Sequence, residues 1–197
     1  MHRAFYLTHP QVRIDPAVKA PDWELSDVGQ ARAAVAGAAK WTSGVTTIVS
    51  SAERKAVETA AIIGAARGID PAARADMHEN DRSATGYLEP AEFEATADAF
   101  FARPRESVRG WERAADAQAR IVSAVRGVVA GARAGDILFV GHGAVGTLLL
   151  CHLLEEPISR TRDQAAGGGH VFCWDAATGR VRHGWLKLED DGVGMLG

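Results

Sequence analysis

The sequence predicts an α/β fold, a three-layer α/β/α sandwich whose sheet is mainly parallel. Short apolar or β-branched runs, typical of buried strands, alternate with stretches that repeat apolar residues at helical spacing. The chain has 197 residues, a length that suits a single domain over residues 1–197, and no internal repeat or linker divides it. The stretch at about 76–107 begins with polar, irregular sequence and is a candidate excursion over the sheet edge.

The expected strands are apolar or β-branched and stop at turn-forming residues. The first one stops at His9-Pro10, because proline cannot donate a ladder hydrogen bond. The last two expected strands form a hairpin around a turn at Asp175–Gly179. The expected strands are Ala4–Thr8, Thr46–Val49, Ile137–Val140, His170–Trp174 and Val181–Leu188.

The expected helices begin at a capping residue or a proline and end near a glycine or a proline. Ser26 caps the first helix. The second is expected over Arg54–Arg67, with Ser51 as its N-cap, Glu53 in its first turn and Gly68 at its end. Its expected apolar stripe consists of Val57, Ala61 and Ile62. The other expected helices run through Gln30–Ala38, Pro90–Phe101, Trp111–Ala134 and Val145–Leu153.

The composition excludes several functional classes. Hydrophobic residues make up 47% of the chain, charged residues 24%, and the net charge is -3. The chain is therefore not disordered as a whole, nor basic enough for a dedicated binder of nucleic acid or membrane surfaces. No run approaches the roughly 18 apolar residues of a membrane span, and no signal peptide is recognised. With Cys151 and Cys173 read as buried hydrophobes, we expect a cytoplasmic protein.

Candidate functional residues follow the expected strands. In an open α/β sheet, ligands bind outside the carboxyl ends of the strands. The first strand ends at Thr8 and His9, and the second strand, Thr46–Val49, leads to Arg54. The Ile137–Val140 strand leads to His142. If these strands are neighbours, two histidines and an arginine meet at one edge of the sheet. Glu79, in the polar loop that follows, could join them.

This set of side chains suits phosphoryl transfer. A neutral imidazole is a competent nucleophile near pH 7, and a phosphohistidine divides one difficult reaction into two easier steps. The phosphoryl oxygens need cations such as Arg54 and amides at a helix N-terminus. The leaving alkoxide needs a proton, which Glu79 could supply. Because the remaining histidines lack paired ligand spacing, we expect no metal, and we expect no cofactor.

Four blocks in this order carry a resemblance to a known family. The blocks are Leu7–His9, Leu25–Ala31, Ser50–Ala60 and Val140–Gly143. They resemble the histidine phosphatase superfamily, which has the phosphoglycerate mutase-like fold. The resemblance implies that His9 is the phosphorylated nucleophile and that Arg54 and His142 belong to the phosphate pocket. It also implies that Glu79 is the proton donor.

One departure from that family concerns the opening motif. The family has Arg-His-Gly, whereas this chain has Thr8-His9-Pro10. The pocket thereby loses a charge-assisted contact of about 1.5–3 kcal/mol. Either another cation refills the place, or the substrate carries less charge, or the protein binds a ligand without turning it over. The candidate cations are Arg13, Lys55 and Arg82, and Arg82 is favoured because it lies in the loop beside Glu79.

We therefore predict a metal-independent phosphatase acting on a small phosphomonoester, with His9, Glu79 and His142 as catalytic residues. Its expected substrate-binding residues are Arg54, Arg82 and Thr8. The main alternative is a phosphate-binding or regulatory domain with the same fold and impaired catalysis. A phosphomutase is less favoured, because the chain has no long insertion to form a lid.

A dinucleotide-binding protein is also less favoured. Gly141–Gly146 spells the Gly-x-Gly-x-x-Gly fingerprint between a strand and a helix, with Asp163 downstream. That fingerprint normally opens its domain, and its acid ends a second strand. The expected partner is a small phosphorylated molecule or inorganic phosphate, and a homodimer is left open. The identity of the substrate is not readable from the sequence.

Overall fold

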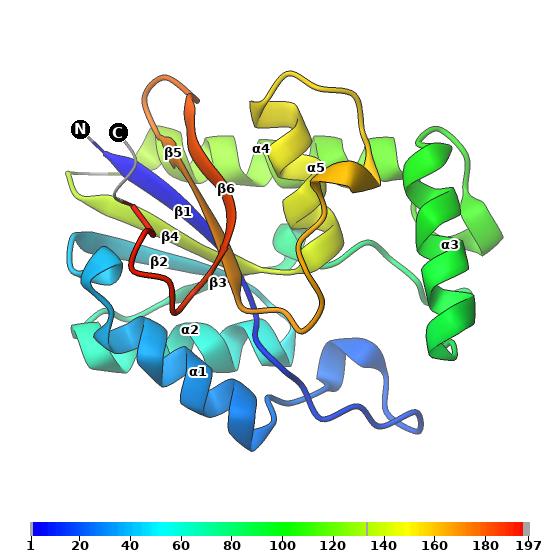
Figure 1. Cartoon of the computed structure of the whole chain (residues 1–197), viewed down its shortest axis with the longest axis horizontal. Coiled ribbons are helices and arrows are strands. Elements are labelled where there is room, and N and C mark those ends of the chain that lie inside the picture. Colours follow the sequence, from blue (N-terminus) through cyan, green and yellow to red (C-terminus); the bar gives the residue numbers. More distant parts are fainter. Residues whose placement is uncertain (1, 133, 195–197) are drawn as a thin grey trace.

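The computed structural model describes residues 2–132 and 134–194 and confirms the α/β class (Figure 1). Its six-stranded sheet has the order β3-β2-β4-β1-β5-β6. The strands are β1 (Arg3–Thr8), β2 (Val45–Ser51), β3 (Ala72–Arg74), β4 (Asp136–Gly141), β5 (His170–Asp175) and β6 (Val181–Lys187). The first four run parallel to one another, and β5 is antiparallel to both β1 and β6. The sheet is thus mainly parallel, with the expected hairpin at one edge.

Helices cover both faces of the sheet and complete the three layers. The helices are α1 (Asp27–Ala38), α2 (Arg54–Arg67), α3 (Pro90–Ala102), α4 (Ala114–Gly131) and α5 (Gly143–Leu153). Figure 1 shows α1 and α2 together on one face, and α4 and α5 on the other. The expected cap Ser26 accepts a hydrogen bond from Gly29 N–H at the start of α1.

Alternate residues of the central strands fill two separate cores. Phe5 and Leu7 of β1 belong to the core beneath α1 and α2. Tyr6, between them, belongs to the core beneath α4 and α5. A strand covered on both faces needs apolar residues at every position, because neither set of side chains reaches water. This requirement explains the uninterrupted apolar runs of β1 and β4.

Three local features differ from the sequence prediction. The short edge strand β3 was not expected, since Ala72–Arg74 contains none of the β-branched residues that favour strands. The helix expected from Trp111 is shorter, because a turn at Val108–Gly110 precedes it and Trp111 itself is extended. Glu53, expected in the first turn of α2, is instead its N-cap, and Ser51 ends β2.

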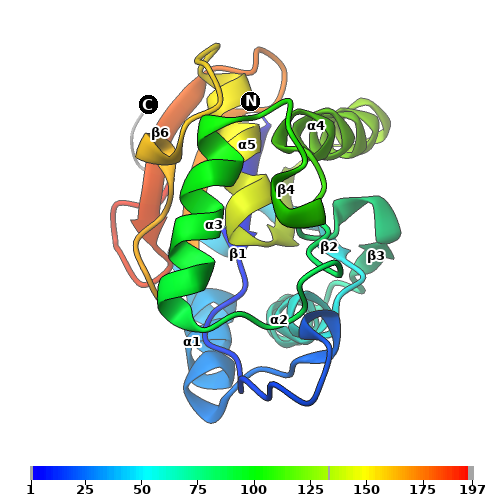
Figure 2. The ribbon, with the colours of Figure 1, turned by 90° about the vertical axis from the view of Figure 1, so that its right-hand side faces the viewer.

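The candidate excursion contains α3, which stands at the end of the sheet where the parallel strands finish (Figures 1 and 2). Phe100 and Phe101 on α3 are 1% and 3% exposed, so this pair leaves no apolar patch for a partner. Arg160, from the segment before β5, pairs with Glu94 and Asp98 of α3 and ties the helix to the body. Within residues 2–132 and 134–194, no helix is both long and apolar enough to cross a membrane.

A run of glycines before β5 lies directly against His9. Gly167, Gly168 and Gly169 all have positive φ angles, which side chains other than that of glycine rarely adopt. Gly169 N–H donates to the His9 carbonyl at 3.1 Å. A Cβ atom on Gly168 would lie 2.3 Å from the same carbonyl oxygen. The glycine run therefore lets the chain pass close behind His9.

We expect Gly168→Ala to lower the free energy of unfolding by about 3 kcal/mol or more, because backbone strain and overlap with His9 add. Gly179→Ala is the matched control, since Gly179 also has a positive φ but no atom lies near its Cβ position. It should cost only about 1–2 kcal/mol. Urea unfolding of both variants measures the difference. If both variants lose the same free energy of unfolding, the overlap with the His9 carbonyl adds nothing to the cost of Gly168→Ala.

Candidate active site

The parallel pairing of β1 with β4 brings the two histidines together. Thr8, the last residue of β1, is paired with Gly141, the last residue of β4. His9 and His142 follow these residues and therefore emerge side by side at the carboxyl edge of the sheet. Their rings lie edge to face with centroids 5.4 Å apart.

His9 is held by three hydrogen bonds. Its backbone N–H donates to Gly141 O at 2.9 Å, and its carbonyl accepts from Gly169 N–H. Its ring nitrogen Nδ1 lies 2.8 Å from the Pro10 carbonyl. A carbonyl can only accept, so Nδ1 carries the proton and Nε2 keeps its lone pair. Burial, with the charges of Lys55 and Arg82, lowers the pKa of His9 to about 4.

His142 is fully buried and is positioned through its backbone. The Tyr6 hydroxyl accepts from His142 N–H at 3.1 Å and donates to His142 O at 3.3 Å. Neither ring nitrogen has a hydrogen-bond partner among the described residues. Burial lowers the pKa of His142 well below its usual value. The ring is therefore neutral and free to bind a ligand.

Glu53 and Lys55 form a buried ion pair beside His142. Their side chains are only 10% and 5% exposed. Glu53 Oε1 lies 3.6 Å from His142 Nε2 and accepts from Glu79 N–H at 2.8 Å. Burial opposes ionisation of Glu53, but the charge and hydrogen bond of Lys55, together with the Glu79 amide, outweigh it and hold the pKa of Glu53 below its usual value. Lys55 also donates to Ala20 O at 2.7 Å.

Glu79 lies at the N-terminus of α5, next to His142. Its carboxylate accepts from Ala144 N–H and Val145 N–H, both at 3.1 Å. These amides are otherwise unpaired in the first turn of the helix, where negative charge is favoured. The structure therefore brings Glu79 to the histidine pair, as expected from the sequence, and uses it as a helix cap.

Arg82 is the half-buried arginine of the same loop. Its guanidinium lies over the rings of Phe93 and Trp111, at 5.1 and 5.7 Å from their centroids. Its charge is close enough to lower the pKa of both histidines. By contrast, Arg13 pairs with Glu24 at 2.7 Å and is 63% exposed. Of these two candidates for the missing cation, Arg82 is the one near the site.

Thr8 makes structural hydrogen bonds in place of an arginine contact. Its hydroxyl donates to Gln164 Oε1 at 2.7 Å and accepts from His170 N–H at 3.0 Å. A Cβ atom on Gly143 would lie 2.7 Å from Gln164 Nε2. The amide group of Gln164 therefore faces the turn after His142, and Thr8 holds the carbonyl end of that amide.

The expected role of Arg54 in the phosphate pocket does not fit its position. Its side chain is 52% exposed and pairs with Glu24 at 2.5 Å and with Glu58 at 2.8 Å. The buried positions of α2 are Lys55, Ala56, Thr59, Ala60, Ile63 and Gly64. Arg54 and Val57 lie on the outer face of that helix, so the expected apolar stripe was wrong. Lys55, one residue on, faces the histidines.

The Gly-x-Gly-x-x-Gly match is explained by packing. A Cβ atom on Gly141 would lie 2.2 Å from the Tyr6 hydroxyl oxygen, and one on Gly146 would lie 2.6 Å from Cε1 of the Tyr6 ring. The downstream acid Asp163 accepts from Thr147 Oγ1 at 2.9 Å. These glycines thus make room for the tyrosine that holds His142.

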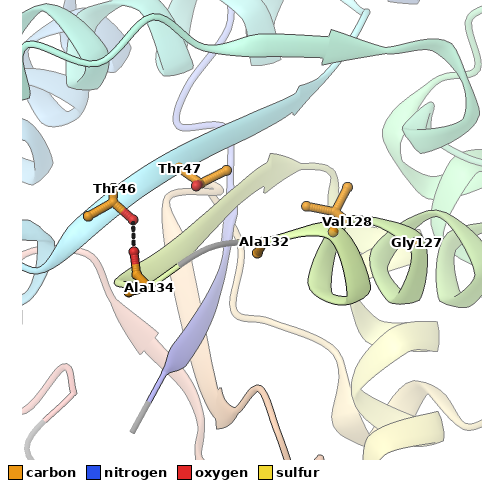
Figure 3. A pocket seen from close by; sticks show the side chains of 7 residues that line it. Thr46, Thr47, Gly127, Val128, Ala132 and Ala134 are labelled. Carbon is orange, nitrogen blue, oxygen red and sulfur yellow. Dashed lines mark hydrogen bonds between the residues drawn. The ribbon is translucent and has the colours of Figure 1, made fainter.

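Other places in the fold offer less chemistry. Within the described ranges, no three His, Cys, Asp or Glu side chains are grouped as a metal ion would require. Figure 3 shows a hollow between the start of β2 and the end of α4, at the edge of the sheet opposite the histidines. Its lining residues are Thr46, Thr47, Gly127, Val128, Gly131, Ala132 and Ala134. None of these seven residues has an ionisable side chain.

Comparison with solved structures shows the same fold in several proteins, two of which are phosphatases by name. A mycobacterial glucosyl-3-phosphoglycerate phosphatase in complex with inorganic phosphate is 22% identical, with a TM-score of 0.79 over 96% of this chain and 100% of that one. YhfR of Bacillus stearothermophilus is 21% identical, with a TM-score of 0.78 over 93% and 95%. Phosphoserine phosphatase of Entamoeba histolytica is 16% identical, with a TM-score of 0.72 over 92% and 94%.

The sequence itself identifies the family. No curated protein matches the chain. The family model described as histidine phosphatase superfamily (branch 1) matches residues 10–183, from directly after His9 to β6. Because this match spans most of the 197 residues, the chain belongs to the histidine phosphatase superfamily.

Proposed function

We propose that the chain is a metal-independent phosphatase that hydrolyses a small phosphomonoester through a phosphohistidine on His9. The observation that carries the proposal is the state of that ring. Its proton is on Nδ1, bound to Pro10 O, and its lowered pKa keeps Nε2 unprotonated at neutral pH. The solved phosphatases of the same fold act, by their names, on small phosphorylated compounds, which supports this substrate class.

The reaction has two steps. The lone pair of His9 Nε2 forms a bond to phosphorus while the bond to the leaving oxygen breaks, and that oxygen takes a proton from Glu79. Water then attacks the phosphohistidine and gives a proton to Glu79. The N–P bond breaks, its electron pair returns to Nε2, and inorganic phosphate is released. Glu79 therefore gives up a proton in the first step and recovers one from water in the second.

The cations proposed to bind the phosphoryl group are Lys55 and Arg82. The ammonium of Lys55 is buried beside His142 and Glu53. Arg82 lies over two aromatic rings, which fix the direction of its guanidinium. In this proposal Lys55 replaces Arg54 as a cation that binds the phosphoryl oxygens, and Arg82 keeps the role expected from the sequence.

A second candidate function is a phosphate-binding or regulatory domain without turnover. The Thr8–Gln164 hydrogen bond favours it, since the motif position that holds an arginine in the family here holds a neutral hydroxyl bound to a neutral amide. An amide donor binds a phosphoryl oxygen more weakly than a guanidinium does. Both functions predict that phosphate binds, but only the phosphatase hydrolyses a phosphomonoester. Measured turnover therefore distinguishes them.

The native protein should hydrolyse an aryl phosphate in the presence of a chelator, and His9→Ala should abolish the activity. The reason is that the imidazole supplies the nucleophile and no metal-bound water is used. Release of the aryl alcohol measures the rate. If phosphate or vanadate binds but no pH between about 5 and 8 gives turnover, the binding domain is the better description.

Lys55→Met should lower kcat/KM by at least about tenfold, because it removes the buried cation of the site. Arg54→Met is the matched control and should change kcat/KM by less than about threefold, since its exposed ion pairs contribute little. Thermal unfolding checks that both variants fold. A larger loss for Arg54→Met would restore Arg54 to the phosphate site.

The His9 ring should stay neutral down to about pH 4, where an exposed imidazole would titrate near 6.5. A lowered pKa means that the unprotonated nucleophile persists as the pH falls from 8 to 5. NMR titration of the ring protons, assigned with His9→Gln, gives the midpoint directly. A midpoint close to 6.5 would contradict burial as the controlling effect.

A further inference from the structure

Glu53 is the charged residue of the site that the phosphatase reaction does not use. Its carboxylate is 10% exposed and lies among the groups assigned to the substrate. One oxygen, Oε1, is 3.6 Å from His142 Nε2 and accepts from Glu79 N–H. The other oxygen accepts from Lys55 Nζ. A carboxylate thus takes the donors that would hold an anionic phosphoryl oxygen.

The structure points to a specific role for this carboxylate. We propose that Glu53 determines which ligands the site prefers, an inference that rests on the function proposed above. Its carboxylate is a fixed negative charge in the phosphoryl subsite and lowers the affinity for doubly charged ligands. Two of the three N–H donors of Lys55 already bind Glu53 and Ala20 O, so a phosphoryl group must share the ammonium with Glu53. It then lies beside a carboxylate that keeps its negative charge.

The charges around the site explain the direction of this preference. His9 and His142 are neutral, so the fixed positive charges near them are Lys55 and Arg82. The carboxylates of Glu53 and Glu79 offset these charges. The energy of repulsion between Glu53 and a ligand grows with the ligand's charge. A ligand with one negative charge at phosphorus is therefore disfavoured less than one with two.

The backbone supports the same assignment. Glu53 is the N-cap of α2, with φ and ψ of -70° and 140°, and Lys55 follows in the first turn of that helix. The Ser51 hydroxyl accepts from Glu53 N–H at 3.2 Å and fixes the turn after β2. The carboxylate therefore comes from a fixed position at the carboxyl edge of the sheet, as His9 and His142 do.

The test compares two phosphonates whose P–C bond the enzyme does not hydrolyse. Benzylphosphonate carries two charges at alkaline pH, and its monomethyl ester carries one. Calorimetry gives the dissociation constant of each for the native protein, Glu53→Gln and Glu106→Gln. The last variant is the matched control, because it removes one carboxylate from an exposed pair with Arg103.

Glu53→Gln should tighten the binding of benzylphosphonate by at least about tenfold and that of the ester by about threefold, because repulsion scales with charge. Glu106→Gln should change neither constant. Equal changes for the two ligands, no change, or no binding by either protein would overturn the proposal. If Glu53→Gln does not fold, Glu53→Leu serves, since it removes the same charge from Lys55.

Hydrolysis of an aryl phosphate keeps this result separate from the proposed function. Turnover that depends on His9, with phosphonate affinities unaffected by Glu53→Gln, rejects the role of Glu53 alone. Selective tightening in Glu53→Gln without any turnover rejects the phosphatase and retains Glu53 as the residue that selects ligands by charge.

Discussion

The parallel pairing of β1 with β4 is the constraint on which the site depends. It places Thr8 opposite Gly141 and delivers His9 and His142 at the same level of the sheet edge. The hydrogen bond from His9 N–H to Gly141 O extends this pairing by one residue beyond the strand. Shifting the pairing by one residue would move alternate side chains to the opposite face and separate the histidines.

The fold and part of the site were predictable from local sequence. Buried strands of a parallel sheet have continuous apolar runs, so β1, β2 and β4 were recognised. The rule that ligands bind at the carboxyl ends of strands then indicated His9 and His142. Glu79 was reached through a family resemblance and its polar loop, and the structure places its carboxylate at the N-terminus of α5.

The misplacement of Arg54 has a specific cause. Arg54 was assigned to the phosphate pocket because it follows β2 and because of the family resemblance, and the expected apolar stripe of Val57, Ala61 and Ile62 did not identify the buried face of α2. Of the six buried residues of α2, only Ile63 is a large apolar one, so the buried face carries little hydrophobic signal. Thr59 and Ile63 repeat at intervals of four from Lys55, and this spacing would have indicated the lysine instead.

Other contributors to the site could not be read from the sequence because they are distant in the chain. Gln164 meets Thr8 across 156 residues, and Tyr6 meets His142 across 136. Such contacts arise only when the sheet has assembled. The glycines that mimic a dinucleotide fingerprint belong to this group, since Gly141 and Gly146 make room for Tyr6 and Gly143 makes room for Gln164.

The same assembly explains how a site with two carboxylates remains stable. A buried charge is costly unless it is paired and hydrogen-bonded. Glu53 has Lys55 and a backbone amide, and Glu79 has two amides of α5. Each carboxylate is therefore satisfied in the absence of a ligand, and the site is ordered before a ligand enters. A bound ligand must compete with Glu53 and Glu79 for the donors that these carboxylates already occupy. The affinity of the site therefore reflects the difference between the hydrogen bonds that the ligand makes to these donors and those that the carboxylates make in its absence.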